Sequence, residues 1–411
     1  MRILIATCHR AIIGGIESYL RILIPALLKR GHNIAVLYER HSRDGETTVD
    51  PAEAALTLWF WEDLQRTPAL WQELLAWKPD VVYAHGSASL ELENILLNNY
   101  PTVLYAHVYL GTCTTGRKSH SFPQMQPCGR RFGPMCLVLH YPRRCGGLNP
   151  LEAWRAFQFQ SRRNTRLTHY SALLVASTHM YREFEQHGIS RDKLQLVPLP
   201  IDSTLPTTPL VSKTPEGRLL FVGRLTDLKG VRHLLEAIQI AVEKVGRSLT
   251  LTIAGDGPER VRLQEFARRH GVAAEFVGWV NSTQKLDLMR QADLLVVPSL
   301  WPEPFGLVGI EAGTLGLPAV GYAVGGIPDW LIPGQTGELA PGDPPTVSGL
   351  ADAIGRALAE PSHYAELCRG ARKLASRFTL NTHVRKLEEI LIASTNTVNW
   401  TTAGYSRPVS S

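Results

Sequence analysis

Two glutamates, Glu303 and Glu311, stand with seven residues between them in a segment that suits a binding site. Pro304 and Gly306 predict a turn that opens a helix, with unpaired N–H groups near residues 305–307. Glu303 would lie just outside this helix, and Glu311 about two turns inside it. A carboxylate can accept hydrogen bonds from two adjacent sugar hydroxyls, so the segment predicts a sugar-binding site. Two unrelated surface glutamates are the alternative, which the flanking residues disfavour.

Two cations, Arg224 and Lys229, follow the strand predicted over residues 219–222. The turn after such a strand faces the ligand-binding edge of a parallel sheet, so both side chains would point into a cleft. Together they can neutralise a diphosphate, when it is bound and when it leaves. The alternative is a solvated basic loop.

A glycine pair, Gly14 and Gly15, follows the first predicted strand and precedes a helix. Glycines let a ligand approach the backbone, and a helix N-terminus offers free N–H groups to a phosphate. A tight turn without a ligand explains the pair equally well. The segment lacks the full dinucleotide fingerprint, so it supports a dehydrogenase only weakly.

Strands and helices alternate along the chain, which predicts an α/β fold with two parallel sheets covered by helices. A proline-rich stretch from residue 198 to residue 209 separates the two halves and predicts an interdomain linker. Nothing in the sequence of residues 338–341 assigns them a structure or a role. The expected strands cover residues 2–7, 33–38, 80–84, 102–106, 173–176, 194–197, 219–222, 249–254, 294–297 and 318–322. The expected helices cover residues 16–30, 230–245, 346–358, 363–376 and 381–392.

These segments resemble glycosyltransferase family 4, a family of retaining enzymes. The shared motifs, in family order, are residues 14–17, 223–230, 255–258, 303–311 and 325–329. The resemblance implies the GT-B fold, with two Rossmann-like domains facing a central cleft. It places an acceptor-binding domain at residues 1–200 and an NDP-sugar-binding domain at residues 201–380. Residues 381–394 would form a helix returning to the first domain, and residues 395–411 a flexible tail.

The resemblance also implies roles for single residues. Glu303 would contact the donor sugar, Glu311 the ribose, and Arg224 and Lys229 the diphosphate. His107 matches a histidine facing the donor, although a structural hydrogen bond at a strand end would also explain it. The remaining donor-binding positions implied are Gly15, Gly223, Gly257, Val280, Phe305, Gly306 and Leu307.

The implied reaction is sugar transfer from an NDP-sugar to a lipid-linked, polysaccharide or other glycan acceptor, as in cell-surface polysaccharide biosynthesis. The cations and helix N-termini would stabilise the departing diphosphate, so catalysis requires no cofactor. The acceptor would attack from the face that the diphosphate leaves. A carboxylate nucleophile, Glu303, is the less favoured route. A non-catalytic sugar-nucleotide or glycan-binding module on the same fold is the alternative function.

Four cysteines, Cys113, Cys128, Cys136 and Cys145, lie within 33 residues of an insertion at about 107–147. A structural Zn²⁺ would suit a loop with little apolar core, although the spacing matches no C-x2-C pair. His107, His120 and His140 are spare ligands. Two disulfides, an iron–sulfur cluster and four free thiols remain alternatives.

The chain of 411 residues has 44% hydrophobic and 19% charged residues, which excludes a disordered chain, a coiled coil and a collagen-like fibre. No run is long enough to span a bilayer, and no signal peptide is expected, so we expect a cytoplasmic protein. The net charge is +6, yet residues 94–151 contain six basic residues and no acid. This asymmetry favours an anionic acceptor or peripheral association with the inner face of the membrane. No nucleic-acid recognition fold is visible, so nucleic acid is not an expected partner.

Overall fold

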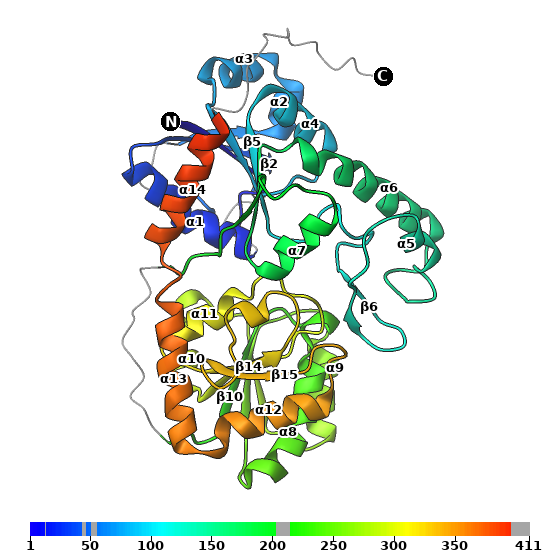
Figure 1. The fold of residues 1–411 in the computed structure, drawn as a ribbon, viewed down its shortest axis with the longest axis vertical. Coiled ribbons are helices and arrows are strands. Elements are labelled where there is room, and N and C mark those ends of the chain that lie inside the picture. Colours follow the sequence, from blue (N-terminus) through cyan, green and yellow to red (C-terminus); the bar gives the residue numbers. More distant parts are fainter. Residues whose placement is uncertain (13, 43–46, 51–55, 203–213, 396–411) are drawn as a thin grey trace.

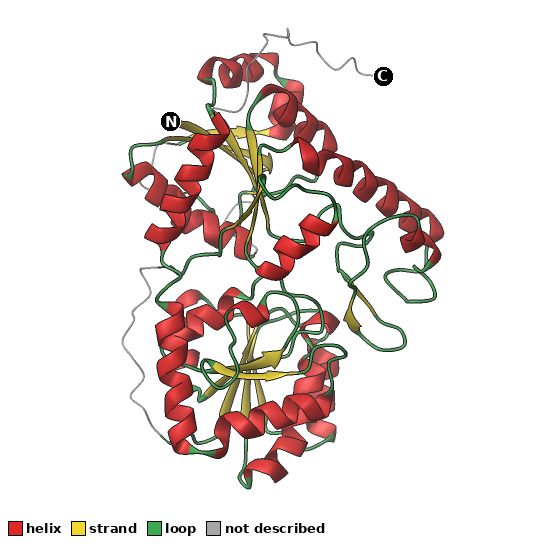
Figure 2. Ribbon diagram, in the orientation of Figure 1, coloured by secondary structure: helices red, strands yellow, loops and turns green. Residues whose placement is uncertain are grey.

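The computed structural model describes residues 1–411 except 13, 43–46, 51–55, 203–213 and 396–411. The GT-B architecture is present: two α/β domains lie end to end, each with one parallel sheet between helices (Figures 1 and 2). Residues 203–209 of the predicted linker and nearly all of the predicted tail lie outside the described residues. None of the described helices is both long and apolar enough to cross a membrane.

The first sheet has seven strands in the order β3-β2-β1-β4-β5-β8-β9, and neighbouring strands pair in parallel. Alternate residues of β1 show why the sheet is central: Ile3 and Ile5 pack on one face, and Leu4 and Ala6 on the other. Both faces are therefore buried. The strands are β1 (Arg2–His9), β2 (Asn33–Arg40), β3 (Thr57–Phe60), β4 (Val81–Ala84), β5 (Thr102–Ala106), β8 (Ala172–Val175) and β9 (Leu194–Leu196).

The second sheet has six strands in the order β12-β11-β10-β13-β14-β15, also parallel. The central strands are short apolar runs, and the sequence predicted them. The edge strands β12 and β15, and the edge strand β3 of the first sheet, were not predicted. β3 and β12 are partly exposed, and β15 contains residues with little preference for strands. The strands are β10 (Arg218–Val222), β11 (Thr250–Ala254), β12 (Ala274–Gly278), β13 (Leu294–Val297), β14 (Ala319–Tyr322) and β15 (Gly337–Ala340).

Helices cover both sheets, and the five predicted helices are confirmed to within three residues at each end. In the first domain they are α1 (Gly15–Lys29), α2 (Trp61–Arg66), α3 (Pro68–Trp77), α4 (Leu90–Asn99), α5 (Met135–Val138), α6 (Pro150–Arg166) and α7 (Thr178–Gln186). In the second they are α8 (Val231–Val245), α9 (Arg260–Arg269), α10 (Ser282–Gln291), α11 (Leu307–Thr314), α12 (Val347–Ala359) and α13 (Pro361–Ala375).

The last helix, α14 (Leu380–Thr395), leaves the second domain and packs on α1 of the first (Figure 1). His383 fixes it there, with one ring nitrogen 2.7 Å from the Tyr19 hydroxyl and the other 2.8 Å from the Pro198 carbonyl oxygen. Where the chain crosses between domains, the Ile201 N–H donates to the Phe378 carbonyl oxygen at 2.8 Å. The two crossings therefore run side by side.

Candidate active site

An ion pair with a buried carboxylate joins the loops after β10 and β13. The Lys229 ammonium lies 2.5 Å from Glu303 Oε1, and the Ser299 hydroxyl donates to the same oxygen at 2.5 Å. Burial raises the pKa of the Glu303 carboxyl, but the charge of Lys229 and its hydrogen bonds lower that pKa more, so the net shift is downward. Glu303 is thus a carboxylate at neutral pH, held in one position.

The backbone around Glu303 is fixed by the glycines predicted as a motif. The Gly326 N–H donates to the Glu303 carbonyl oxygen at 2.6 Å. A Cβ on Gly325 would lie 2.3 Å from that same oxygen, so only glycine fits there. Tyr109 of the first domain donates its hydroxyl hydrogen to the Pro302 carbonyl oxygen at 2.7 Å. The carboxylate therefore sits where the two domains touch.

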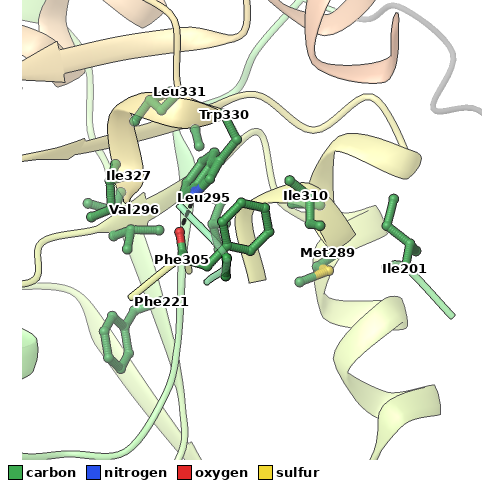
Figure 3. Packing of buried hydrophobic residues seen from close by; sticks show 14 of the residues in the cluster. Ile201, Phe221, Met289, Leu295, Val296, Phe305, Ile310, Ile327, Trp330 and Leu331 are labelled. Atoms are coloured by element: carbon green, nitrogen blue, oxygen red, sulfur yellow. Dashed lines mark hydrogen bonds between the residues drawn. The ribbon is translucent and has the colours of Figure 1, made fainter. Parts of the chain in front are cut away.

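The start of α11 is shaped by Trp330 (Figure 3). Its indole N–H donates to the Phe305 carbonyl oxygen at 2.6 Å. A Cβ on Gly309 would lie 2.1 Å from the Trp330 ring, so the ring packs directly against the helix backbone. Gly306 caps α11 with a φ of +88°, a left-handed conformation that favours glycine. This packing fixes the free N–H groups at the helix start.

A cavity of about 210 Å³ between the domains brings Gly15, Leu307 and Glu311 together. Glu311 forms an ion pair with Lys285 of α10, with 2.7 Å between Oε2 and Nζ. Tyr19 also lines the cavity from the side of α1. The structure thus joins the glycine turn of the first domain to the second glutamate of the E-x7-E segment.

The loop after β10 places Arg224 in solvent, where no hydrogen bond or ion pair among the described residues engages its side chain. The loop packs tightly on the loop after β11, since a Cβ on Gly255 would lie 1.9 Å from the Gly223 carbonyl oxygen. The Leu225 N–H donates to the Asp256 carbonyl oxygen at 2.9 Å, which brings Gly257 alongside. Arg224 is therefore an available cation on a well-fixed loop.

The positions expected near the base also lie together. The Gly255 N–H donates to the Gly278 carbonyl oxygen at 2.7 Å, so the loops after β11 and β12 adjoin. Val280 packs against the core beside an exposed Trp279.

His107 lies just beyond the end of β5 and forms a pair with His85, with 2.9 Å between Nε2 and Nδ1. Burial, and the positive charge that His383 can carry, lower the pKa of His107 to about 3. Burial lowers the pKa of His85 as well. Both rings are neutral at physiological pH, so His107 offers a hydrogen bond and not a charge. The Tyr19 ring lies 5.8 Å from it and links it to the cavity.

Four partners at this site were not predicted: Ser299, Lys285, Tyr109 and His85. Ser299, Lys285 and His85 contact their partners only because of the fold, and no motif in the sequence indicates them. For Tyr109 a signal did exist, since it lies two residues beyond His107.

The cysteines of the insertion lie near one another, but their metal remains untested. Burial raises the pKa of Cys145 to about 11, and the charges of Cys128, Cys113 and Cys136 add to the shift. All six cysteines of the chain are free. Among the described residues, no three metal-ligating side chains converge on one point. His140, which is buried beside Cys145, leaves its Nδ1 without a partner.

Structural zinc therefore stays a prediction. We expect protein purified under reducing conditions to carry about one zinc per chain by elemental analysis, and the Cys128→Ser and Cys136→Ser variants to lose it. The Cys368→Ser variant, remote from the insertion, is the control. A folded metal-free sample would contradict this, and thiol titration of that sample would distinguish disulfides from free thiols.

Comparison with known proteins gives the family. A model described as "Glycosyltransferase Family 4" matches residues 13–205, and one described as "Glycosyl transferases group 1" matches residues 209–374. The chain belongs to glycosyltransferase family 4. This family 4 member is 29% identical to the glycogen synthase of Mycobacterium tuberculosis over 96% of this chain and 95% of that protein. It is 35% identical to D-inositol 3-phosphate glycosyltransferase 2 of Catenulispora acidiphila, over 42% of this chain and 44% of that protein.

Solved structures agree on the fold of this glycosyltransferase. Anabaena HepE in complex with UDP-glucose matches with a TM-score of 0.68 and 19% identity, covering 96% of this chain and all of that one. Sucrose-phosphate synthase from Thermosynechococcus elongatus matches with a TM-score of 0.68 and 20% identity, covering 96% and 98%. At such identities the likeness concerns the GT-B fold alone.

Proposed function

We propose that the chain is a retaining hexosyltransferase that moves a sugar from an NDP-sugar to a glycan or lipid-linked acceptor. The observation that carries the proposal is the fixed Glu303–Lys229 pair in the cleft, with Arg224 available nearby. Anabaena HepE, a protein of the same fold, was solved with UDP-glucose, which supports a nucleotide-sugar donor. The glycogen synthase relative supports a glycan acceptor.

In the proposed reaction, the bond between the anomeric carbon and the diphosphate oxygen breaks, and a bond to an acceptor hydroxyl oxygen forms on the same face. The acceptor proton passes to the departing phosphate oxygen. Arg224 and Lys229 stabilise the negative charge that grows on the diphosphate. No metal is required for this step.

Glu303 is better placed as a fixed charge than as a nucleophile. Both Lys229 and Ser299 bind the oxygen Oε1, and they hold the carboxylate as a weak base. A negative charge held in this way stabilises the positive charge that develops on the sugar ring. His107, being neutral, is suited to hydrogen-bond a sugar hydroxyl.

The direct test is a screen of the purified protein against UDP-, GDP- and ADP-hexoses, measuring nucleotide release and binding. We expect slow release from one donor, and NMR of the glycoside formed with an acceptor should show the donor's anomeric configuration. An inverted product would contradict the retaining mechanism. A failure of every donor to bind would contradict the assigned function.

Glu311 should act on binding more than on transfer. Because its carboxylate faces the cavity and is held by Lys285, the Glu311→Ala variant should raise the donor KM about tenfold with kcat changed less than about twofold. Glu265→Ala, an exposed substitution on α9, is the control and should change neither constant. An unchanged KM in Glu311→Ala would remove this residue from the donor site.

We further propose an anionic acceptor and action at the cytoplasmic face of a membrane. Among the six basic residues between residues 94 and 151, Arg117 pairs with Asp227 and the buried Lys118 pairs with Glu183. The other four, which form no ion pair among the described residues, support both proposals.

A further inference from the structure

Large exposed apolar side chains concentrate on one part of the molecule. Twelve such side chains are exposed among the described residues, and seven of them come from residues 122–154. Leu148 is 80% exposed and Val138 65% exposed. These seven side chains, here called the apolar tip, are Phe122, Met135, Val138, Tyr141, Leu148, Leu151 and Trp154.

The elements that carry the apolar tip adjoin one another. Helix α5 contacts α6. The ring of Phe132, which precedes α5, lies 5.1 Å from the ring of Phe157 in α6. Trp154 stacks beside Phe157 at 6.2 Å. The Phe122 N–H donates to the Arg143 carbonyl oxygen at 3.1 Å, which ties the loop at β6 (Ser119–His120) to the same region. Figure 1 shows α5, α6 and the β6 loop projecting together from the side of the first domain.

Arginines without an ion pair occur in the same stretch of the chain as the apolar tip. Arg130, Arg131, Arg144 and Arg155 are exposed, and the described part of the chain gives none of them an ion pair. The exposed arginines of α9 differ, because Arg262 pairs with Glu259 and Arg269 with Glu265. The charge at the tip is therefore left available for an external anion.

We propose that the apolar tip docks on a membrane surface rich in anionic lipids. Apolar side chains can enter the acyl boundary of such a membrane, and arginines can bind its phosphate headgroups. A nucleic acid would not explain the exposed leucines. The tip contains one acid, Glu152, between Leu151 and Trp154. A protein partner with an acidic surface is the other occupant, which the vesicle experiment separates from a membrane.

Docking there would hold the cleft near the bilayer. Arg117 of the insertion forms an ion pair with Asp227, 2.6 Å apart, and Asp227 lies in the loop that carries Arg224 and Lys229. A lipid-linked acceptor would thus reach the donor site from the bilayer. This acceptor route rests on the proposed sugar transfer, whereas membrane binding by the tip does not.

The experiment is flotation of the full chain with phosphatidylcholine vesicles, with and without phosphatidylglycerol. We expect binding only to the anionic vesicles, weakened by salt. The variant Arg130→Gln/Arg131→Gln/Arg144→Gln should bind about a hundredfold more weakly, at roughly fivefold for each arginine. The variant Leu148→Ser/Leu151→Ser/Trp154→Ser should also lose vesicle binding. Its thermal unfolding should match that of wild type, because the three side chains that it replaces are exposed.

A matched control removes similar groups from α9, as Val261→Ser/Arg262→Gln/Arg269→Gln, and should float like wild type. Glu303→Gln should also float like wild type, because docking does not need transfer. Wild-type binding that ignores lipid charge, or tip variants that bind as well as wild type, would overturn the proposal. So would self-association of wild type, abolished in the tip variants, in the absence of vesicle binding.

Discussion

Replacing Glu303 with glutamine should lower kcat about 10²- to 10³-fold and change the donor KM less than about threefold. Glutamine has the shape of glutamate and can still accept the hydrogen bond from Ser299, but it carries no negative charge. The charge acts mainly when positive charge develops on the sugar, so the loss should appear in kcat. Steady-state kinetics with the donor identified by the screen measures both constants.

Two further variants make this result specific. Ser299→Ala removes one hydrogen bond to the carboxylate but keeps its charge, so kcat should fall only a few-fold. Glu303→Gln should remain folded, because Lys229 is partly exposed and water can solvate its ammonium. Thermal unfolding checks the fold. If Glu303→Gln kept wild-type kcat, the fixed-charge role would be wrong.

Acid should destabilise the protein well before its carboxylates protonate. Burial is the largest cause of a strong downward shift in the pKa of five histidines, and for four of them the value is about 3 or about 4. These histidines are His85, His107, His179, His187 and His383. The unfolded chain takes up these protons below about pH 6.5, whereas the native chain does not until much lower pH. The stabilisation is therefore complete above about pH 6.5 and is lost as the pH falls towards 3.

The expected size is large. Between about pH 7.5 and about pH 5, each histidine should remove about 1–2 kcal/mol from the free energy of unfolding, or about 5 kcal/mol or more in total. Chemical denaturation at a series of pH values measures this slope. In the His383→Gln variant, the glutamine amide can replace both hydrogen bonds of the histidine. The pH dependence of its free energy of unfolding should therefore correspond to the uptake of about one proton fewer. A free energy of unfolding that is the same at both pH values would contradict the burial of these rings.

The sequence predicted the parts of the site that depend on local pattern. Pro304 and Gly306 signal the start of α11, and the strands ahead of Arg224 and His107 are apolar runs; all three features are in the structure. The contacts that fix the side chains could not be predicted. Lys229 and Glu303 lie 74 residues apart in the chain, so their 2.5 Å contact depends on how the loops after β10 and β13 meet.

The same reason explains what was missed elsewhere. The ion pair of Arg117 with Asp227 joins two domains, and neither residue stands in a pattern that indicates the other. β15 contains Gly337 and Glu338, residues with little preference for strands, and only its pairing with β14 makes it one. The roles of the donor-site residues remain predictions until the variants are measured.

The return of α14 to the first domain has a consequence for biosynthesis. Leu387 and Leu391 are fully buried, and α14 packs against α1, which the ribosome releases hundreds of residues earlier. The second domain can close its core while this helix is still being made. The first domain cannot, because α1 keeps an uncovered apolar face until residues 380–395 emerge. The domain that is translated first is therefore completed last, and a nascent chain stalled before α14 would be a substrate for chaperones.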